Sequence, residues 1–293
     1  MPSSHLDEPL LTWYADHSRD LPWRRPDRTP WGVLVSEVML QQTPVDRVVP
    51  AWHAWLARWP TPASLAIDTS GEAVRMWGRL GYPRRALRLH AAATACVERF
   101  AGQVPSAYDD LRSLPGVGDY TAAAVLAFAF GRRAVVLDTN VRRVLARVLD
   151  GAALPRPSVT VAERAGAESV LPDDDASAAL WSVAVMELGA LVCTASSPRC
   201  AECPVADRCA WFAAGRPAYD GPSRAAQRFA GTDRQVRGLL LAVARDAPHP
   251  VPKESLDAVW ADAVQRERAL DSLVADGLLD PLTDGRFALP GSP

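Results

Sequence analysis

The stretch Leu114-Pro115-Gly116-Val117-Gly118 (the glycine loop) separates two segments whose apolar residues have helical spacing. The second predicted helix starts around Tyr120 or Thr121 and runs to Phe130. Two glycines two residues apart permit a sharp turn at positive φ, which leaves backbone N–H groups at the helix start to bind an anion such as a phosphate. A plain helix–helix connection is the alternative, and a bare Gly-x-Gly would favour it. The complete string before an alanine-rich helix favours the phosphate site.

About twenty residues later, an apolar segment delivers Asp138 to the start of another predicted helix, Val141–Leu149. In one interpretation Asp138 is a helix N-cap, which stabilises a helix by about 1 kcal/mol. A carboxylate beside a phosphate-binding loop would also lie near a sugar–phosphate backbone. There it could stabilise the positive charge that a sugar develops when its glycosidic bond breaks, as carboxylates do in glycosidases. The two interpretations are compatible.

Residues 32–44 form a mostly apolar predicted helix whose single acid is Glu37. A solvent-facing glutamate is the ordinary case, but the apolar surroundings predict that Glu37 is at least partly shielded. Shielding raises the pKa of a carboxyl group and suits it to donate a proton near neutral pH. Gln41 and Gln42 at the end of this helix are either an ordinary polar terminus or side chains that insert into a duplex.

Four of the five cysteines lie close together, with the spacing Cys193-x6-Cys200-x2-Cys203-x5-Cys209. An odd total in a chain without a secretory signal argues against a disulfide framework. Four thiolates suit either zinc or a [4Fe–4S] cluster, and the single Cys-x2-Cys pair favours the cluster because zinc sites often have two such pairs. The fifth, Cys96, lies in an apolar predicted helix and is expected to be a small core residue.

The 293 residues are enough for two domains and an appendage, and 48% of them are apolar. A net charge of −2 gives no general attraction to a polyanion, so nucleic-acid binding would have to come from local geometry and clustered arginines. The sequence has no apolar run long enough to predict a membrane span, and the N-terminus lacks the pattern of a secretory signal. A cytoplasmic location is therefore expected.

The chain changes character after Cys209. Residues 215–230 are rich in Gly, Pro, Arg and Ala and are predicted to be a linker. The sequence shows no convincing alternation of period two before residue 280. Residues 231–293 (the C-terminal module) have the pattern of a winged-helix-like unit. The predicted elements are helices over Thr232–Arg245, Lys253–Trp260 and Ala263–Asp276, and a hairpin over Gly277–Leu289 that turns at Asp284-Gly285. Seven basic and ten acidic residues make this module a poor candidate for DNA binding.

In combination, these motifs resemble those of the endonuclease III superfamily of helix-hairpin-helix DNA glycosylases, and within it they are most similar to the MutY family of adenine glycosylases. The resemblance covers about residues 8–212. It rests on Leu-Pro-Trp-Arg at 21–24, Ser-Glu-Val-Met-Leu-Gln-Gln-Thr at 36–43, Gly-Tyr at 81–82, the glycine loop, Leu-Asp-x-Asn-Val at 137–141 and the four-cysteine spacing.

This resemblance implies an all-α, two-domain fold with the C-terminal module attached. The implied parts are a six-helix barrel with the helix-hairpin-helix at residues 23–130, an iron–sulfur cluster domain at 1–22 plus 131–214, the linker at 215–230, and the module at 231–293. Cys193, Cys200, Cys203 and Cys209 would hold a structural [4Fe–4S] cluster.

The resemblance also implies a role for each matching residue. Glu37 would protonate the adenine ring and activate water, and Asp138 would stabilise the oxocarbenium-like sugar. Tyr120 and Asn140 would position these two groups.

Because such chemistry requires the base to leave the stack, further residues would grip the duplex and enclose the flipped base. Gln42 and Tyr82 would wedge into the duplex. The full set of implied DNA contacts is Gln41, Gln42, Tyr82, Gly116, Val117 and Gly118. The implied base pocket consists of Trp23, Arg24 and Glu187.

Relatives that also cut the strand use a lysine just after the glycine loop, at the place where this chain has Tyr120. Lys253 is the only lysine, so lysine-based lyase chemistry is not expected. The resemblance implies a monofunctional glycosylase that removes adenine mispaired with 8-oxoguanine or guanine in double-stranded DNA. A monomer in the bacterial cytoplasm, associated with the nucleoid, is expected.

Three features depart from the family pattern. Thr139 stands where glycine is usual, Pro83 stands where a second aromatic is frequent, and about sixty mainly helical residues replace a larger α/β domain that reads 8-oxoguanine. The base required opposite the target is therefore open. The alternatives are a glycosylase for thymine or uracil opposite guanine, a non-catalytic helix-hairpin-helix DNA-binding protein, and a small electron carrier. Glu37 and Asp138 argue against a binding role alone, because gripping a phosphate needs neither.

Overall fold

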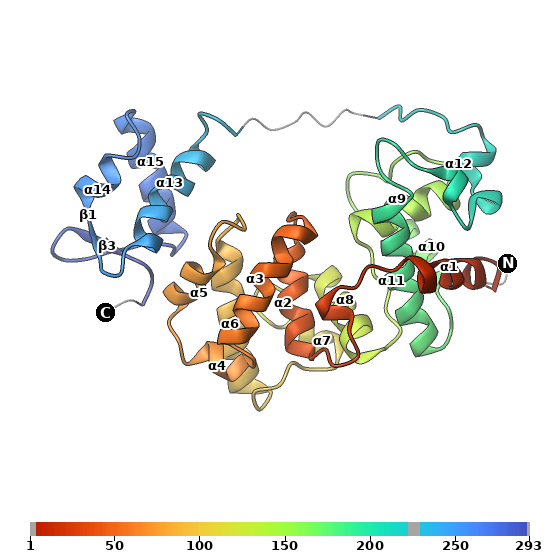
Figure 1. The fold of residues 1–293 in the computed structure, drawn as a ribbon, viewed down its shortest axis with the longest axis horizontal. Helices are drawn as coiled ribbons and strands as arrows, with labels where there is room; N and C mark the ends of the chain where they lie inside the picture. Colours follow the sequence, from red (N-terminus) through yellow and green to blue (C-terminus); the bar gives the residue numbers. More distant parts are fainter. Residues whose placement is uncertain (1–3, 222–228, 292–293) are drawn as a thin grey trace. The chain divides into compact units, whose positions relative to one another are not determined.

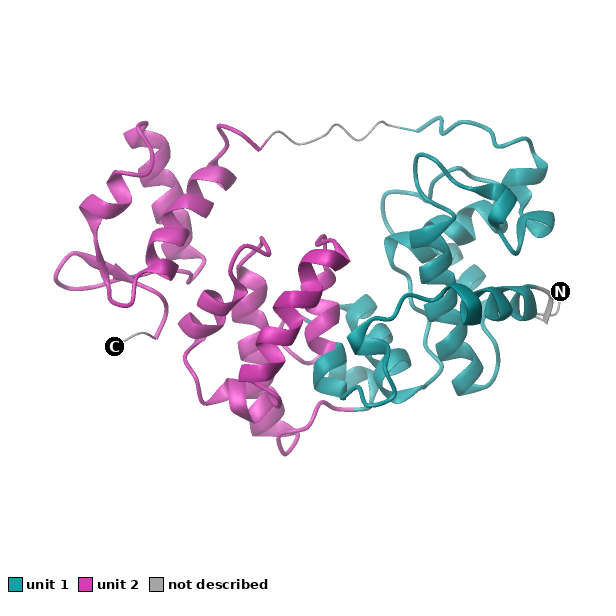
Figure 2. Ribbon diagram, viewed as in Figure 1, with its two compact units in different colours: residues 1–33, 106–112, 117–223 teal, residues 34–105, 113–116, 224–293 magenta. Residues whose placement is uncertain are grey.

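The structure is a computed structural model that describes residues 4–221 and 229–291. The chain divides into two discontinuous compact units (Figure 2). The first unit contains residues 1–33, 106–112 and 117–223, and the second contains residues 34–105, 113–116 and 224–293. Helices dominate both units, and within the described residues strands occur only in the C-terminal module (Figure 1). The predicted all-α fold is confirmed. No helix in the described ranges is long and apolar enough to cross a membrane.

The first unit is built around two helices that pack against each other, α9 (Thr139–Val148) and α11 (Asp175–Leu191). Its other elements are α1 (Ser4–His17), η1 (Pro22–Arg24), α7 (Tyr108–Arg112), α8 (Asp119–Phe130), α10 (Val161–Val170), η2 (Cys200–Glu202), η3 (Ala206–Arg208) and α12 (Ala210–Ala213), where η marks a 3-10 helix. α9 buries apolar residues at positions i, i+3, i+4 and i+7, which places them on one face: Val141, Val144, Leu145 and Val148.

The second unit has a tryptophan-rich core. Its helices before the C-terminal module are α2 (Pro30–Leu40, which begins in the first unit), α3 (Val45–Arg58), α4 (Pro62–Ala66), α5 (Ser70–Trp77) and α6 (Arg84–Arg99). The ring of Trp55 packs edge-on against Trp59 and Trp77, with centroids 4.7 and 5.7 Å away, and all three are fully buried. Cys96 is also fully buried, as predicted.

The C-terminal module contains three helices and a three-stranded antiparallel sheet. Its elements are α13 (Asp233–Asp246), β1 (Val251–Pro252), α14 (Lys253–Asp257), α15 (Ala263–Ala275), β2 (Asp280–Pro281) and β3 (Arg286–Ala288). The strand order is β1-β3-β2, so the predicted hairpin is present as β2 and β3. Strand β1 was not predicted, because two residues are too short to show alternation. Residues 222–228 of the predicted linker lie outside the described residues.

The C-terminal module is joined to α5 by one hydrogen bond between backbone groups and by hydrogen bonds from two arginine side chains to backbone carbonyls. The amide of Gly71 donates to the carbonyl of Pro290 at 2.8 Å, and a Cβ at residue 71 would lie 2.6 Å from that oxygen. Arg75 donates to the carbonyls of Arg245 and Ala247, and Arg245 donates to the carbonyl of Gly78. This contact requires a glycine at 71, and the sequence pattern gave no indication of it.

Candidate active site and cluster site

Asp138 caps α9, as one interpretation of the sequence predicted. One carboxylate oxygen accepts the amide N–H of Val141 at 2.6 Å, and the other accepts Nδ2 of Asn140 at 2.8 Å. Desolvation by burial raises the pKa of Asp138, and the hydrogen bonds from Val141 and Asn140 oppose that shift. The carboxylate is therefore fixed in direction and stripped of part of its water.

Asn140 is itself held by Arg143 and by a close helix contact. Nη2 of Arg143 donates to Oδ1 of Asn140 at 2.9 Å and to the carbonyl of Gly189 at 2.6 Å, and Nε donates to the carbonyl of Cys193 at 2.8 Å. A Cβ at Gly189 would lie 2.7 Å from the Cβ of Asn140. Glycine at 189 therefore allows α11 to approach α9 at the point where Asn140 orients Asp138.

Tyr120 is the second residue of α8 and is partly buried. Its ring packs against a small apolar cluster that includes Ala123, Ala124 and Val136. The position that holds a lysine in strand-cutting relatives is thus a packed aromatic in this chain.

The glycine loop makes the predicted turn at positive φ through one of its two glycines. Gly116 has φ of 79°, whereas Gly118 has φ of −95° and ψ of 179° and serves as the N-cap of α8. Gly116 therefore makes the turn, and Gly118 is extended. A Cβ at Gly116 would lie 2.8 Å from the Cβ of Arg88, whereas nothing lies within 4 Å of a Cβ at Gly118. Gly116 and Gly118 are exposed, and Val117 is buried.

Glu37 lies in the second unit, on a helix that is almost wholly buried. Its exposed fraction is 4%, and Leu34 and Met39 nearby are completely buried. The predicted shielding of Glu37 is confirmed. Asp138 and Asn140 belong to the first unit, so each unit carries one of the two predicted acids.

Gln42 and Tyr82 share an unusual backbone conformation. Gln42 follows the end of α2 with φ of 57°, and Tyr82 precedes α6 with φ of 47°. Both are exposed, and Gln41 is half-buried. Left-handed φ is uncommon for residues other than glycine and marks positions that their surroundings constrain.

Glu187 is fully buried and holds two arginines. Its Oε1 accepts the amide and Nε of Arg19 at 3.0 and 2.7 Å, and its Oε2 accepts Nη2 of Arg19 at 2.7 Å and Nη2 of Arg24 at 3.0 Å. Desolvation by burial favours a raised pKa, but the arginine hydrogen bonds outweigh it and lower the pKa of Glu187 to about 2. Four bonds occupy the lone-pair sites of the carboxylate. Arg19 was missed by the sequence analysis, since nothing distinguishes it from other arginines.

Two neighbours complete this region. Trp23 is 5% exposed in η1. Nη1 of Arg24 is a buried donor with no hydrogen-bond partner within the described residues. The structure thus joins Arg24 to Glu187 and places Trp23 beside Arg24 in the chain.

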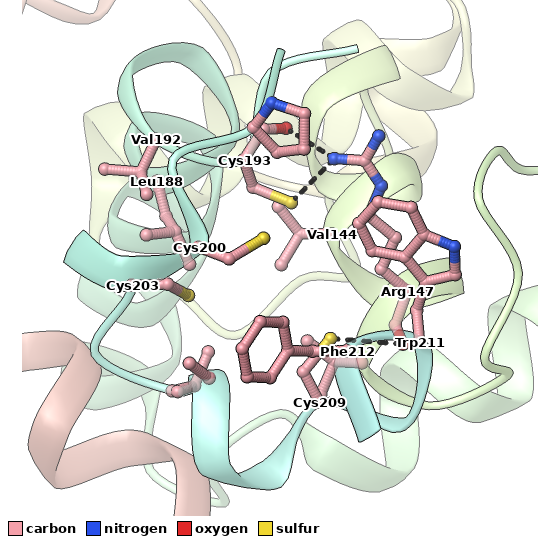
Figure 3. Close-up of a pocket in the computed structure, with 14 residues that line it drawn as sticks. Val144, Arg147, Leu188, Val192, Cys193, Cys200, Cys203, Cys209, Trp211 and Phe212 are labelled. Carbon is pink, nitrogen blue, oxygen red and sulfur yellow. Dashed lines mark hydrogen bonds between the residues drawn. The ribbon is translucent and has the colours of Figure 1, made fainter. Parts of the chain in front are cut away.

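The four clustered cysteines line one hollow that is partly open to solvent (Figure 3). They come from the end of α11, from η2 and from the start of α12. No three Cys, His, Asp or Glu side chains among the described residues lie close enough to share a single metal ion.

Arg147 adds positive charge beside this hollow. Its side chain is buried, Nη1 donates to Sγ of Cys193 at 3.2 Å, and the guanidinium lies 4.5 Å from the ring centre of Trp211. Burial raises the pKa of the Cys203 thiol to about 11. Four thiolates need a metal centre and cations to offset desolvation, and the residues present fit a [4Fe–4S] cluster.

Comparisons with known proteins agree with this geometry. Residues 35–165 match the family described as HhH-GPD superfamily base excision DNA repair protein, and residues 193–209 match the iron–sulfur binding domain of endonuclease III. The adenine DNA glycosylase of Mycobacterium tuberculosis is 51% identical over 97% of this chain and 93% of its own length. That of Mycolicibacterium smegmatis is 52% identical over 96% and 95%.

A solved structure of a thermostable thymine-DNA glycosylase superposes with a TM-score of 0.65 at 25% identity, covering 72% of this chain and 97% of that one. The match of residues 193–209 to the iron–sulfur binding domain, together with the adenine DNA glycosylase relatives, shows that this chain carries a [4Fe–4S] cluster. With 51% identity across nearly its whole length, the chain belongs to the adenine DNA glycosylases, N-glycosyl hydrolases of base excision repair that bind DNA.

Proposed function

We propose that this adenine DNA glycosylase removes adenine paired with 8-oxoguanine or guanine by hydrolysis alone. The observation that carries the chemistry is the Asp138 carboxylate, partly desolvated and aimed by Val141 and Asn140. A fixed, poorly hydrated anion stabilises a developing sugar cation more strongly than a hydrated one does.

In the proposed reaction Glu37 is the general acid. It gives its proton to the adenine ring, the C1′–N9 bond breaks with its electrons going to the base, and Asp138 stabilises the cationic sugar. Water then adds its oxygen to C1′ and returns a proton to Glu37, so the enzyme ends unchanged. Tyr120 and Asn140 position the reacting groups. The [4Fe–4S] cluster supplies iron–thiolate bonds that cross-link residues 193–209.

The glycine loop is proposed to bind a phosphate through the backbone of Gly116, Val117 and Gly118. Its exposed turn immediately before α8 supports this role. Gln42 and Tyr82 are proposed to enter the duplex, with Gln41 beside them. Their exposure and left-handed backbone support this role.

Trp23, Arg24 and Glu187 are proposed to form the adenine pocket. Because all the acceptor sites of Glu187 are used, we assign it the task of orienting Arg24 rather than of accepting the adenine amino group. Nη1 of Arg24 then suits one of the acceptor nitrogens of adenine.

We propose that the protein has no lyase activity, because the surroundings of Lys253 do not suit its amine to act as a nucleophile. Its Nζ donates to Asp257 at 2.9 Å and to Glu267 at 2.6 Å, and hydrogen bonds to Glu267 and Asp257 raise its pKa. A Schiff-base nucleophile must be an uncharged amine, which this pairing disfavours. Borohydride trapping should give no covalent DNA adduct, and a trapped adduct would contradict this proposal.

The test is single-turnover excision from duplexes that carry A opposite 8-oxoguanine, A opposite G, T opposite G, and U opposite G. Wild type should release adenine from the first two only. Asp138→Asn and Glu37→Gln should each slow release by at least about 100-fold. The thymine duplex is included because a thymine-DNA glycosylase shares this fold. Release of thymine but not adenine would overturn the proposed substrate.

We also propose that the protein acts as a monomer at the bacterial nucleoid in the cytoplasm. Sedimentation with and without a 20-base-pair duplex should give masses of one chain and of one chain per duplex.

A further inference from the structure

Arg85, in the first turn of α6, is a buried cation that no carboxylate pairs with among the described residues. It is 5% exposed. Its guanidinium donates instead to backbone carbonyls and one hydroxyl. Nη1 contacts the carbonyls of Val38 at 2.8 Å, Met39 at 2.9 Å and Gln41 at 2.7 Å. Nη2 contacts Oγ1 of Thr43 at 3.0 Å and the carbonyls of Gly81 at 3.0 Å and Leu80 at 3.4 Å.

Two of these carbonyls immediately precede the left-handed residues. The peptide of Gln41 leads into Gln42, with φ of 57°, and the peptide of Gly81 leads into Tyr82, with φ of 47°. The carbonyl before a residue moves with its peptide plane, which turns about ψ of the preceding residue and φ of the residue itself, so a carbonyl held in one direction restricts both torsion angles. A single guanidinium therefore constrains φ at both positions.

The negative end of α2 stabilises the buried positive charge of Arg85. Val38 and Met39 lie in the last turn of α2, whose carbonyls have no partner further along the helix and form its negative end. Burial lowers the pKa of Arg85 to about 10, which leaves it charged at neutral pH. Trp77 contributes a second donor, its Nε1, to the carbonyl of Gly81 at 2.9 Å.

We propose that Arg85 is a positioning residue that sets Gln42 and Tyr82 as one rigid unit for entry into the duplex, although it touches no DNA itself. The inference rests on the proposed entry of those two side chains. The planar fork of arginine suits this task, because Nη1 donates to the carbonyls around Gln41 while Nη2 donates toward Gly81, whereas the three N–H donors of an ammonium group leave from a single nitrogen. Without the fork, each loop relaxes toward right-handed φ and its side chain turns away from the base stack.

The experiment compares Arg85→Lys with Arg84→Lys. Arg84 is the preceding residue, with a side chain that is 56% exposed, and it is a matched control. Extrusion is followed by stopped-flow fluorescence of 2-aminopurine in the target position. Excision is measured with adenine opposite 8-oxoguanine in a paired duplex, and with the same adenine inside an unpaired bubble.

Arg85→Lys should slow extrusion and duplex excision at least tenfold, and bubble excision less than threefold. Arg84→Lys should change none of them. Thr43→Val removes the hydroxyl that accepts Nη2 of Arg85 and that itself donates to the carbonyls of Gln41 at 3.3 Å and Leu80 at 3.4 Å. It should show the same pattern at a few-fold size and covers the case in which Arg85→Lys does not fold. Equal losses on duplex and bubble would overturn the proposal, and so would no loss on either.

A double-mutant cycle separates this inference from the proposed entry of the side chains. In a Gln42→Ala, Tyr82→Ala background, Arg85→Lys should cause no further loss of extrusion. An additive loss would overturn the role of Arg85. If Gln42→Ala, Tyr82→Ala alone leaves extrusion unchanged, the proposed wedge fails instead.

Discussion

At the scale of single residues, the fold moves the pKa values of two carboxylates in opposite directions. Asp138 has neutral N–H donors and partial burial, and its pKa rises because desolvation prevails. The side chain of Glu187 has no exposed area, but Arg19 and Arg24 reverse the shift that desolvation would cause and lower its pKa. The carboxylate of Asp138 is thus an anion that a positive charge forming nearby would stabilise. The carboxylate of Glu187 is already paired with Arg19 and Arg24. This contrast suits one group for chemistry and the other for support.

Glu187→Gln should destabilise the protein strongly. The folded pKa of about 2 lies below the ordinary value of 4.5, which corresponds to about 3 kcal/mol of stability at neutral pH. Because the folded pKa is depressed, this stability is fully present above pH 4.5 and is lost as the pH falls toward 2. Urea denaturation of wild type and Glu187→Gln should differ most between pH 6 and 8, and the difference should shrink below pH 4.5.

The matched control for that measurement is Asp20→Asn. Asp20 pairs with Arg25 at 2.7 Å, but both side chains are more than half exposed. Exposed pairs contribute little, so the substitution should leave the urea midpoint unchanged. A Glu187→Gln midpoint equal to wild type at pH 7 would show that the two partly buried arginines, Arg19 and Arg24, do not depend on Glu187.

At the scale of helices, the α9–α11 contact is set by Gly189. Gly189→Ala should force the helices apart, since the new Cβ meets Asn140 at 2.7 Å. The free energy of unfolding should fall by about 1–3 kcal/mol, and single-turnover excision should slow because Asn140 shifts relative to Asp138. Gly166→Ala in α10 is the control: its Cβ would have only Leu149 at 4.0 Å, so it should be neutral or slightly stabilising. Equal effects of the two substitutions would contradict this account.

The segment around the cysteines has few other internal supports, with two short 3-10 helices and a four-residue helix. Cys203→Ala should therefore lower both the absorbance near 400 nm and the melting temperature. Cys96→Ala also removes a buried thiol, but from α6, and should keep the absorbance. Retention of full absorbance in Cys203→Ala would exclude Cys203 as a ligand.

At the scale of the whole molecule, the C-terminal module is part of the second unit. Gly71→Ala should lower the melting temperature, because a Cβ cannot fit 2.6 Å from the carbonyl of Pro290. Calorimetry of the full chain should show this lower melting temperature. Amide hydrogen exchange, measured separately, should be faster in residues 229–291. In a chain ending at residue 221, Gly71→Ala should cost nothing, and a cost there would place the strain elsewhere.

The features that the sequence predicted are those carried by neighbours along the chain. Asp138 as a cap, the burial of Glu37 and the cysteine spacing all follow from patterns a few residues long. Arg85, Arg19 and Gly71 were missed because their partners lie far away in sequence, and nothing local distinguishes them. The pattern Gly-x-Gly also does not tell which glycine makes the turn and which caps the helix, and the structure assigns the turn to Gly116 and the cap to Gly118.

The docking of Pro290 on Gly71 has a consequence for how the protein is made. Residues 34–105 leave the ribosome early, but their module partners follow only after most of the first unit has been synthesised. At typical translation rates this interval lasts roughly 10 to 40 s. During that time α5 exists without Arg245, Ala247 and Pro290, so the second unit stays incomplete until these residues have been synthesised. A chaperone that binds nascent chains would meet α5 without these partners in that interval.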